Sequence, residues 1–130
     1  MSQRELEIIL ARYLAEHLVF PIFIVDPDGN LVFYNEPAER ILGYRFEETG
    51  PMSASQWATI FLPTDLDDQP LAPEELPLVI AVTSRHPAHK SFWIKSLDGN
   101  KRQIEVTAFP LIGQAERFLG AMALFWEVSE

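Results

Sequence analysis

The chain has 130 residues, the size of one ordinary domain, and its hydrophobic (48%) and aromatic (12%) contents are too high for a disordered chain. Ten lysine and arginine residues against nineteen aspartate and glutamate residues give a formal net charge of -9, which argues against nucleic-acid binding and against binding to anionic membranes. Because cysteine is absent, disulfides, thiolate metal sites and cysteine nucleophiles are excluded.

Nothing in the sequence indicates a membrane span or a secretion signal. No apolar run approaches the length of a spanning helix, and the N-terminus carries charged residues where a signal peptide has an apolar core. We therefore expect a soluble, cytoplasmic protein.

The first predicted element is an amphipathic helix over residues 2–18. Ser2 and Glu5 have the spacing of a capping box, which closes the first turn of a helix. Apolar side chains then recur at helical spacing, and these are Leu6, Ile9, Leu10, Tyr13 and Leu14. Such an apolar stripe must cover something, either its own domain or the same helix of a second subunit.

A hairpin and a short helix are predicted next. Residues 22–25 and 31–34 are rich in β-branched and aromatic side chains, and the turn between them carries proline and glycine. Asn35 stands at the N-cap of a predicted helix over residues 36–42, and Gly43 stands just past its end.

The middle of the chain is less regular. Residues 44–72 are predicted to be irregular, with short helical pieces around residues 45–48 and 54–60. A helical pattern returns over residues 76–84, where Pro77 fits only in the first turn.

Three strands are predicted to end the chain, over residues 91–96, 102–109 and 118–127, with a hairpin turn at residues 97–100. The last strand is apolar on both faces, so we expect it to be covered on both faces and to lie in the centre of the sheet. Strands that pair by hairpins, with helices between the two groups of strands, predict an α+β domain with an antiparallel sheet.

Several short motifs stand in a fixed order and spacing along the chain. They are Asp28-Gly29-Asn30, Asn35, Ala38, Gly43-Tyr44, residues 73–78 with Ala81, residues 97–100, and Glu127-Val128-Ser129. Taken together, over residues 20–129, they resemble the PAS family. The final triplet stands where that family usually has Asp-Ile-Thr before its output linker, with Glu and Ser replacing Asp and Thr.

The resemblance implies a PAS-like, five-stranded antiparallel sheet with short helices on one face and a cleft between them. Residues 1–19 would form an extra N-terminal dimerisation helix, and residues 20–130 the PAS domain. Members of the family hold haem, flavin, other chromophores or small metabolites in the cleft, or nothing. They sit upstream of output domains such as histidine kinases or nucleotide cyclases. Because the chain stops at Glu130, where such a linker would begin, we expect a fragment of a longer sensor protein.

Alternation along the strands and spacing along the helices identify candidate residues that line this cleft. The apolar side chains expected to face it are Ile24, Phe33, Ile41, Trp57, Phe61, Val79, Phe92, Val106, Met122 and Leu124. An error of one residue in a short strand inverts its face. The alternative interpretation is that these side chains fill a core at normal density and leave no cavity.

The residues leave the identity of any cofactor open. A cysteinyl-flavin adduct is excluded because cysteine is absent, whereas non-covalent flavin remains open. Haem needs an axial ligand, commonly histidine. Of the three histidines, His17 falls in the first helix, outside the expected cleft, while His86 and His89 flank Pro87 as expected loop residues before a strand.

Motifs for catalysis and for metal binding are missing from the sequence. There is no Gly-x-Ser-x-Gly nucleophile elbow, no phosphate-binding loop and no His-Glu-x-x-His zinc motif. Asp65, Asp67 and Asp68 lack the loop pattern of a calcium-binding hand. We therefore expect a regulatory domain with neither catalytic residues nor a metal site of its own.

Two functional hypotheses follow from the sequence and the resemblance. In the first, a small molecule binds in the apolar cleft, and the change is passed through the last strand to a linked output domain. In the second, the chain is a ligand-free dimerisation or protein-interaction module. Its interface would be the first helix and the apolar outer face of the last strand.

Overall fold

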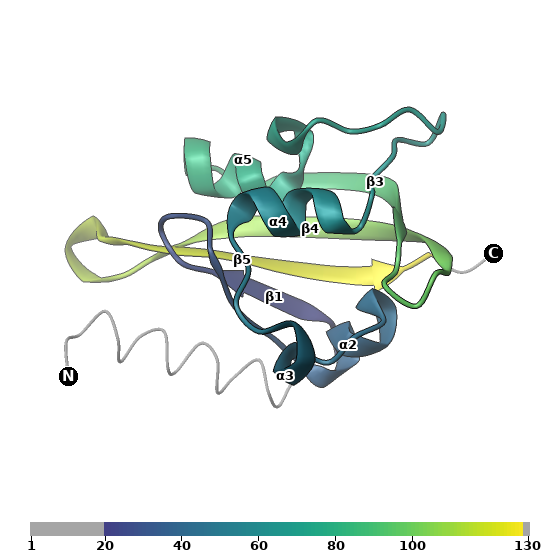
Figure 1. Ribbon diagram of the computed structural model, residues 1–130. Coiled ribbons are helices and arrows are strands. Elements are labelled where there is room, and N and C mark those ends of the chain that lie inside the picture. Colours follow the sequence, from purple (N-terminus) through teal and green to yellow (C-terminus); the bar gives the residue numbers. More distant parts are fainter. Residues whose placement is uncertain (1–19, 129–130) are drawn as a thin grey trace.

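The computed structural model describes residues 20–128, which form one antiparallel sheet with helices over one face (Figure 1). The sheet has five strands in the order β2-β1-β5-β4-β3. The strands are β1 (Ile22–Val25), β2 (Leu31–Tyr34), β3 (Ala88–Lys95), β4 (Lys101–Ile112) and β5 (Phe118–Glu127). The predicted central position of the last strand is confirmed, because β5 pairs with β1 on one edge and with β4 on the other.

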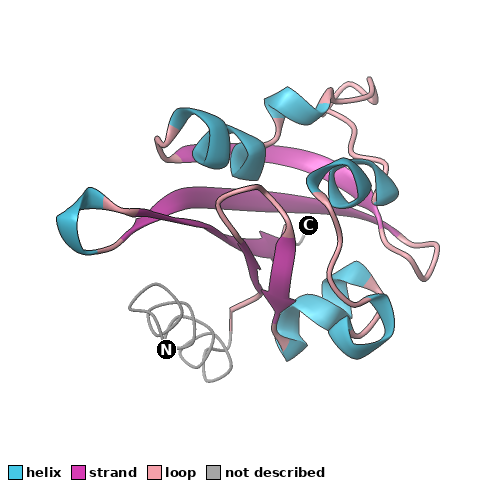
Figure 2. Ribbon diagram, turned by 60° about the vertical axis from the view of Figure 1, so that its left-hand side comes forward, coloured by secondary structure: helices cyan, strands magenta, loops and turns pink. Residues whose placement is uncertain are grey.

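Within residues 20–128, all but one of the helical segments lie between β2 and β3 in the chain. They are α2 (Glu36–Leu42), α3 (Phe46–Thr49), α4 (Ala54–Ile60), the 3-10 helix η1 (Pro73–Glu75) and α5 (Pro77–Ser84). A further 3-10 turn, η2 (Gln114–Glu116), forms the tip of the β4–β5 hairpin, which projects beyond the other strands (Figures 1 and 2). The predicted PAS-like α+β architecture is confirmed. The helix predicted over residues 2–18 lies outside the described residues.

Two strands are longer than the sequence predicts. β3 begins at Ala88 instead of residue 91, and β4 continues to Ile112 instead of residue 109. β4 therefore contains Pro110, although proline has no N–H to donate to a sheet ladder. Pairing between β3 and β4 stops at Ala88 and Ala108, so beyond that point β4 has β5 as its neighbour and a free opposite edge, where proline is tolerated.

Asn35 ties together the first strand, the second strand and the helix that follows. Its side-chain oxygen accepts hydrogen bonds from the backbone N–H groups of Ile22 (3.0 Å) and Ala38 (3.2 Å). Its side-chain amide donates to the carbonyl of Phe20 at 2.9 Å. The residue is only 1% exposed and its bonds to Ile22 and Ala38 are buried, so these two N–H groups would lack a water partner if the side chain were absent. The predicted N-cap is confirmed, and it also fixes where β1 begins.

Gly120 allows β1 to approach β5 closely. Its φ angle is +129°, and a Cβ atom at this position would lie 2.1 Å from the carbonyl oxygen of Val25. The β4–β5 register shifts nearby, between Leu111 and Ile112. Glycine is therefore required here by both backbone conformation and space.

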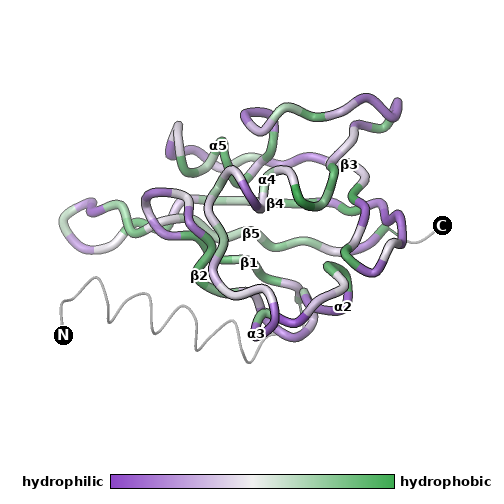
Figure 3. Tube along the Cα trace, in the orientation of Figure 1, coloured by the Kyte–Doolittle hydropathy of each residue, from purple (hydrophilic) through white to green (hydrophobic). Residues whose placement is uncertain are grey.

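Side chains on the two faces of the sheet form two apolar clusters. The larger lies under the helices and includes Phe23, Tyr34, Trp57, Phe92 and Phe125. The smaller lies on the other face and is formed by Ile22, Ile24, Phe33 and Met122. Figure 3 shows the hydropathy of the residues along the chain, with hydrophobic colour on the central strands and hydrophilic colour on several turns. The larger cluster is the one that positions the candidate site.

We predict that Asn35→Ala lowers the free energy of unfolding by about 3 kcal/mol, because it leaves the buried N–H groups of Ile22 and Ala38 without partners. Urea unfolding followed by circular dichroism measures the change. Asn30→Ala is the matched control, since Asn30 lies in an exposed turn and its side chain reaches Asp26 at only 3.5 Å. Equal losses in the two variants would contradict the role assigned to Asn35.

A second prediction compares two glycines that both have positive φ angles. At Gly50 (φ +64°, ψ -172°) a Cβ atom would have no neighbouring atom within 4 Å, so Gly50→Ala should cost about 1–3 kcal/mol of backbone strain alone. Gly120→Ala adds a collision with the backbone of β1 and should cost clearly more than Gly50→Ala. Thermal and urea unfolding of both variants measure the difference, and a similar cost for both would show that β1 and β5 are not tightly apposed.

Candidate ligand cavity

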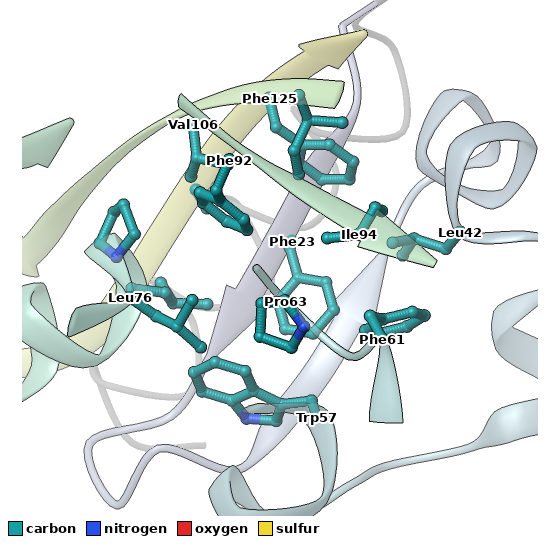
Figure 4. Close-up of a pocket in the computed structure, with 14 residues that line it drawn as sticks. Phe23, Leu42, Trp57, Phe61, Pro63, Leu76, Phe92, Ile94, Val106 and Phe125 are labelled. Atoms are coloured by element: carbon teal, nitrogen blue, oxygen red, sulfur yellow. The ribbon is translucent and has the colours of Figure 1, made fainter. Parts of the chain in front are cut away.

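A cavity of about 80 Å³ lies between the helix-covered face of the sheet and residues of α2, α4 and α5 (Figure 4). Residues from strands β1, β3, β4 and β5 form its floor. Its lining residues are Phe23, Leu42, Trp57, Phe61, Pro63, Leu76, Pro77, Leu78, Phe92, Ile94, Ile104, Val106, Ala123 and Phe125. All of these are apolar by type, and the Trp57 indole carries the only side-chain N–H among them.

Trp57 is held in place by a hydrogen bond and a ring contact. Its Nε1 donates to the carbonyl of Gly29 at 2.7 Å, which joins α4 to the turn between β1 and β2. Its ring meets Phe23 edge-to-face, with centroids 5.6 Å apart. α4 itself begins at a capping box, in which the Gln56 side chain accepts from the Ser53 N–H at 2.9 Å. The indole therefore forms a fixed wall of the cavity.

The segment after α4 closes another side of the cavity by pairing with the sheet edge. Thr64 and Trp93 exchange both backbone hydrogen bonds, at 2.9 and 2.8 Å. The N–H of Lys95 donates to the carbonyl of Phe61 at 2.7 Å. These bonds hold Phe61 and Pro63 against β3, although neither belongs to a strand of the sheet.

Residues 76–78 supply the remaining wall, at the start of α5. Pro77 occupies the first turn of the helix, where its missing N–H is tolerated, as the sequence predicts. Leu76 and Leu78 flank it, and both are buried. Figure 4 shows Leu76 opposite Phe92 and Val106 of the sheet.

No charged side chain lines the cavity, and the groups with shifted pKa values lie elsewhere. Burial raises the pKa of Tyr34, whose hydroxyl donates to the carbonyl of Tyr44 at 2.8 Å. The backbone N–H of Asn100, followed by the charge of Arg102, lowers the pKa of Asp98 in an exposed turn. The cavity walls can therefore exclude water and pack against an apolar group, but they offer no side chain for acid–base or nucleophilic chemistry.

Four of the predicted cleft residues line the cavity: Trp57, Phe61, Phe92 and Val106. Two others, Ile41 and Val79, pack in the same apolar cluster without lining it. Whether any of these residues contacts a ligand stays a prediction.

The predicted orientation of Ile24, Phe33, Met122 and Leu124 is wrong, because all four belong to the cluster on the opposite face of the sheet. Their faces were inverted by one residue, so that the neighbours Phe23, Ala123 and Phe125 line the cavity instead. β1 and β2 have only four residues each, and their pairing contains an irregularity between Ile24 and Val25, so alternation alone does not identify the inner face.

One signal in the sequence could have identified the inner face of β5. Ala121 and Ala123 alternate with larger residues, and small side chains allow helices to approach a sheet closely. Both alanines are buried under the helices, at 0% and 3% exposure. The contributions of Pro63 and Leu76 depend on how the connecting segment folds back, and no periodicity marks them.

The lining residues do not fit haem or flavin. His89 lies in β3 instead of a loop, and its Nδ1 is 2.8 Å from the Thr107 hydroxyl; neither it nor His86 lines the cavity. His17 lies outside the described residues. The lining has no axial ligand for iron, and its single side-chain N–H is already used by Gly29, so the polar edge of a flavin would have no side-chain partner.

A cluster of polar groups ties the C-terminal end of β5 to β4 and α2. Arg102 Nη1 lies 3.2 and 3.3 Å from the two carboxylate oxygens of Glu127, and its Nη2 lies 3.5 Å from Asp98. Its Nε donates to the Ser96 hydroxyl at 3.1 Å, and that hydroxyl donates to the carbonyl of Ile41. Glu127 is the first residue of the triplet that resembles the family's output motif.

Two further features of the described residues bear on function. None of the helices in residues 20–128 is long and apolar enough to cross a membrane. Within the same range, no group of three or more histidine, aspartate or glutamate side chains is arranged to hold a metal ion.

The fold is that of an α+β domain with an apolar cavity between its sheet and its helices, and comparison with known families identifies the family. The sequence matches the family described as PAS fold over residues 15–130. The chain belongs to the PAS family, whose members are regulatory signalling modules. A comparison with curated proteins finds no match.

Solved structures share this fold at low sequence identity. The PAS domain of Bordetella pertussis BvgS is 14% identical, has a TM-score of 0.63 and covers 95% of this chain and 87% of that chain. A PAS domain from a two-component sensor histidine kinase is 18% identical, with a TM-score of 0.61 and coverage of 97% and 100%. The Rhodobacter sphaeroides LOV protein is 15% identical, with a TM-score of 0.71 and coverage of 98% and 69%. These likenesses concern the fold alone.

Proposed function

We propose that this chain is a cytoplasmic sensory domain that binds a small molecule in the cavity and passes the change through β5 to an output domain. The observation that carries the proposal is the double role of β5. Ala123 and Phe125 line the cavity, and two residues further on, Glu127 makes the ion pair with Arg102. One strand therefore joins the binding site to the end of the domain.

The route from the cavity to that end is short and rigid. β5 is paired with β4 as far as Glu127 and with β1 as far as Leu124, so a displacement at Ala123 is carried along the ladder instead of being lost in a loop. Beyond Glu127, the N–H of Val128 still donates to the carbonyl of Gln103 at 2.8 Å. A ligand acts on this end only if it binds two arrangements of the strand with different affinities.

The output domain we propose is a histidine kinase or a nucleotide cyclase, in the same chain or in a partner. Structural neighbours include PAS domains of a two-component sensor histidine kinase and of nitrogen regulation protein NR(II) from Vibrio parahaemolyticus. In this proposal residues 20–130 form the sensory domain, and residues 1–19 precede it as a dimerisation segment.

A second candidate function, a ligand-free dimerisation module, is favoured by exposed aromatic side chains at one end of the sheet. Trp126 is 39% exposed and Phe20 is 54% exposed. Ile22 pairs with Leu124, so continuing the register by two residues places Phe20 opposite Trp126. An exposed aromatic pair next to the predicted N-terminal helix suits an interface with a second copy of the chain.

The relay can be tested without knowing the ligand, by altering the cavity wall on α4. We predict that Trp57→Phe, which removes the bond to Gly29, speeds hydrogen exchange at the Val128 amide about tenfold more than at the Asn35 amide. Exchange followed by NMR measures both rates. Ile60→Ala changes an exposed residue of the same helix and should leave the ratio unchanged. An unchanged Val128 rate, or equal acceleration at both amides, would contradict the relay.

The dimer is tested by removing residues 1–18. We predict that the full chain sediments as a dimer, and that both the truncated chain and Trp126→Ala sediment as monomers. Trp93→Ala is the control, because Trp93 lies on β3, at the far edge of the sheet, and should leave the dimer intact. A truncated chain that remains dimeric would rule out the N-terminal segment as the interface.

A further inference from the structure

The cavity walls consist of aromatic rings and aliphatic side chains. This composition limits the chemical class of ligand that the cavity can bind. Five rings contribute to the lining: Phe23, Trp57, Phe61, Phe92 and Phe125. Aromatic and aliphatic walls gain from contact with apolar atoms, and rings favour edge-to-face packing with another ring. A ligand with apolar surface on all sides therefore fits this lining.

The polar groups of the walls are already engaged or missing. The Trp57 N–H is donated to Gly29 at 2.7 Å. The carbonyl of Phe61 accepts from Lys95 at 2.7 Å, and that of Pro63 accepts from Leu71 at 3.0 Å. Pro63 and Pro77 have no backbone N–H to donate.

A charged or strongly polar ligand would therefore lose its hydration on entry and gain no replacement. Burying an ionised carboxylate without a hydrogen-bonding partner or a counter-charge is among the most unfavourable transfers in proteins. The lining has no arginine, lysine or histidine to act as that partner. Burial of a carboxylate or a phosphate group against these walls is therefore strongly unfavourable.

The size of the cavity limits the ligand further. Pockets that hold drug-sized molecules measure roughly 300–1,000 Å³. A dry apolar cavity of about 150 Å³ in another protein holds benzene or xenon. The cavity here, at about 80 Å³, is about half that size, so the walls must move outward even for a single ring, and a small ligand fits with less displacement than a larger skeleton.

We propose that the ligand of this cavity is a small uncharged hydrocarbon, no larger than a single aromatic ring. The inference rests on the proposed sensory function and narrows it to one chemical class. Xenon and benzene serve as probes of that class. Benzoate has the same ring with a carboxylate and serves as the charged counterpart.

The three tryptophans supply a reporter and two internal controls for an NMR titration of the full chain. Trp57 lines the cavity, whereas Trp93 and Trp126 do not. Benzene or xenon should shift the Trp57 indole N–H resonance in a saturable way and leave those of Trp93 and Trp126 in place. Benzoate at the same concentration should shift none of the three.

Matched variants on β5 locate the binding. Ala123→Met places a longer side chain in the cavity and should weaken benzene binding by about tenfold or more. Leu124→Met introduces the same residue one position along, on the opposite face of the sheet, and should leave binding unchanged. Should Ala123→Met fail to fold, Val106→Leu fills part of the same space from β4.

The results distinguish a failure of the proposed ligand class from a failure of the proposed sensory function. Benzene binding that Ala123→Met or Val106→Leu removes, without benzoate binding, supports the proposal. Benzoate binding, or a failure of benzene and xenon to shift Trp57, overturns the hydrocarbon assignment. In that case, accelerated hydrogen exchange at the Val128 amide in Trp57→Phe would support the sensory function with a ligand of a different class. Unchanged exchange would contradict both the sensory function and the hydrocarbon ligand.

Discussion

The rest of the structure depends on the position of β5, which is paired on both edges and covered by apolar side chains on both faces. A strand in this position must satisfy its backbone through two neighbours and must also suit two different layers of packing. The alternation of Ala121 and Ala123 with Met122 and Leu124 meets the second demand. Gly120 meets the first, because any side chain there would collide with the carbonyl of Val25. Gly120 therefore allows β1 to lie close to one edge of β5, and the two alanines allow the helices to lie close to one of its faces.

The cavity follows from the same arrangement. Ala123 pairs with Phe23 of β1 on one side and with Ala108 of β4 on the other. The short side chains of Ala108 and Ala123 leave space above the middle of the sheet. Phe23, Phe92 and Phe125 line the cavity beneath the helices. The hydrogen bond from Trp57 to Gly29 holds the indole of α4 in position beside this space. A cavity remains here, although protein cores are usually packed without voids of this size.

The same strand connects this space to the polar cluster at the end of the domain. Arg102 contacts Glu127, Asp98 and Ser96, and Ser96 reaches the end of α2 through the carbonyl of Ile41. The side chain of Arg102 is 23% exposed, so these contacts are less screened than ion pairs at the open surface. Strand, adjacent turn and helix therefore meet where a linker to an output domain would leave the sheet, which is the physical basis of the proposed relay.

The sequence by itself determined the order and kind of most elements, the caps of α2 by Asn35 and Gly43, and the central position of β5, because these depend on local backbone preferences and on apolar patterning. It also determined four residues of the cavity wall, and it limited the chemistry, since no cysteine is present and the histidines stand outside the apolar pattern. Only the tertiary structure decided which face of β1, β2 and β5 meets the helices, because strands of period two carry apolar residues on both faces here and a shift of one residue exchanges them. It alone decided that Pro63 and Leu76 close the cavity, since their positions depend on backbone pairing between Thr64 and Trp93, residues far apart in the chain.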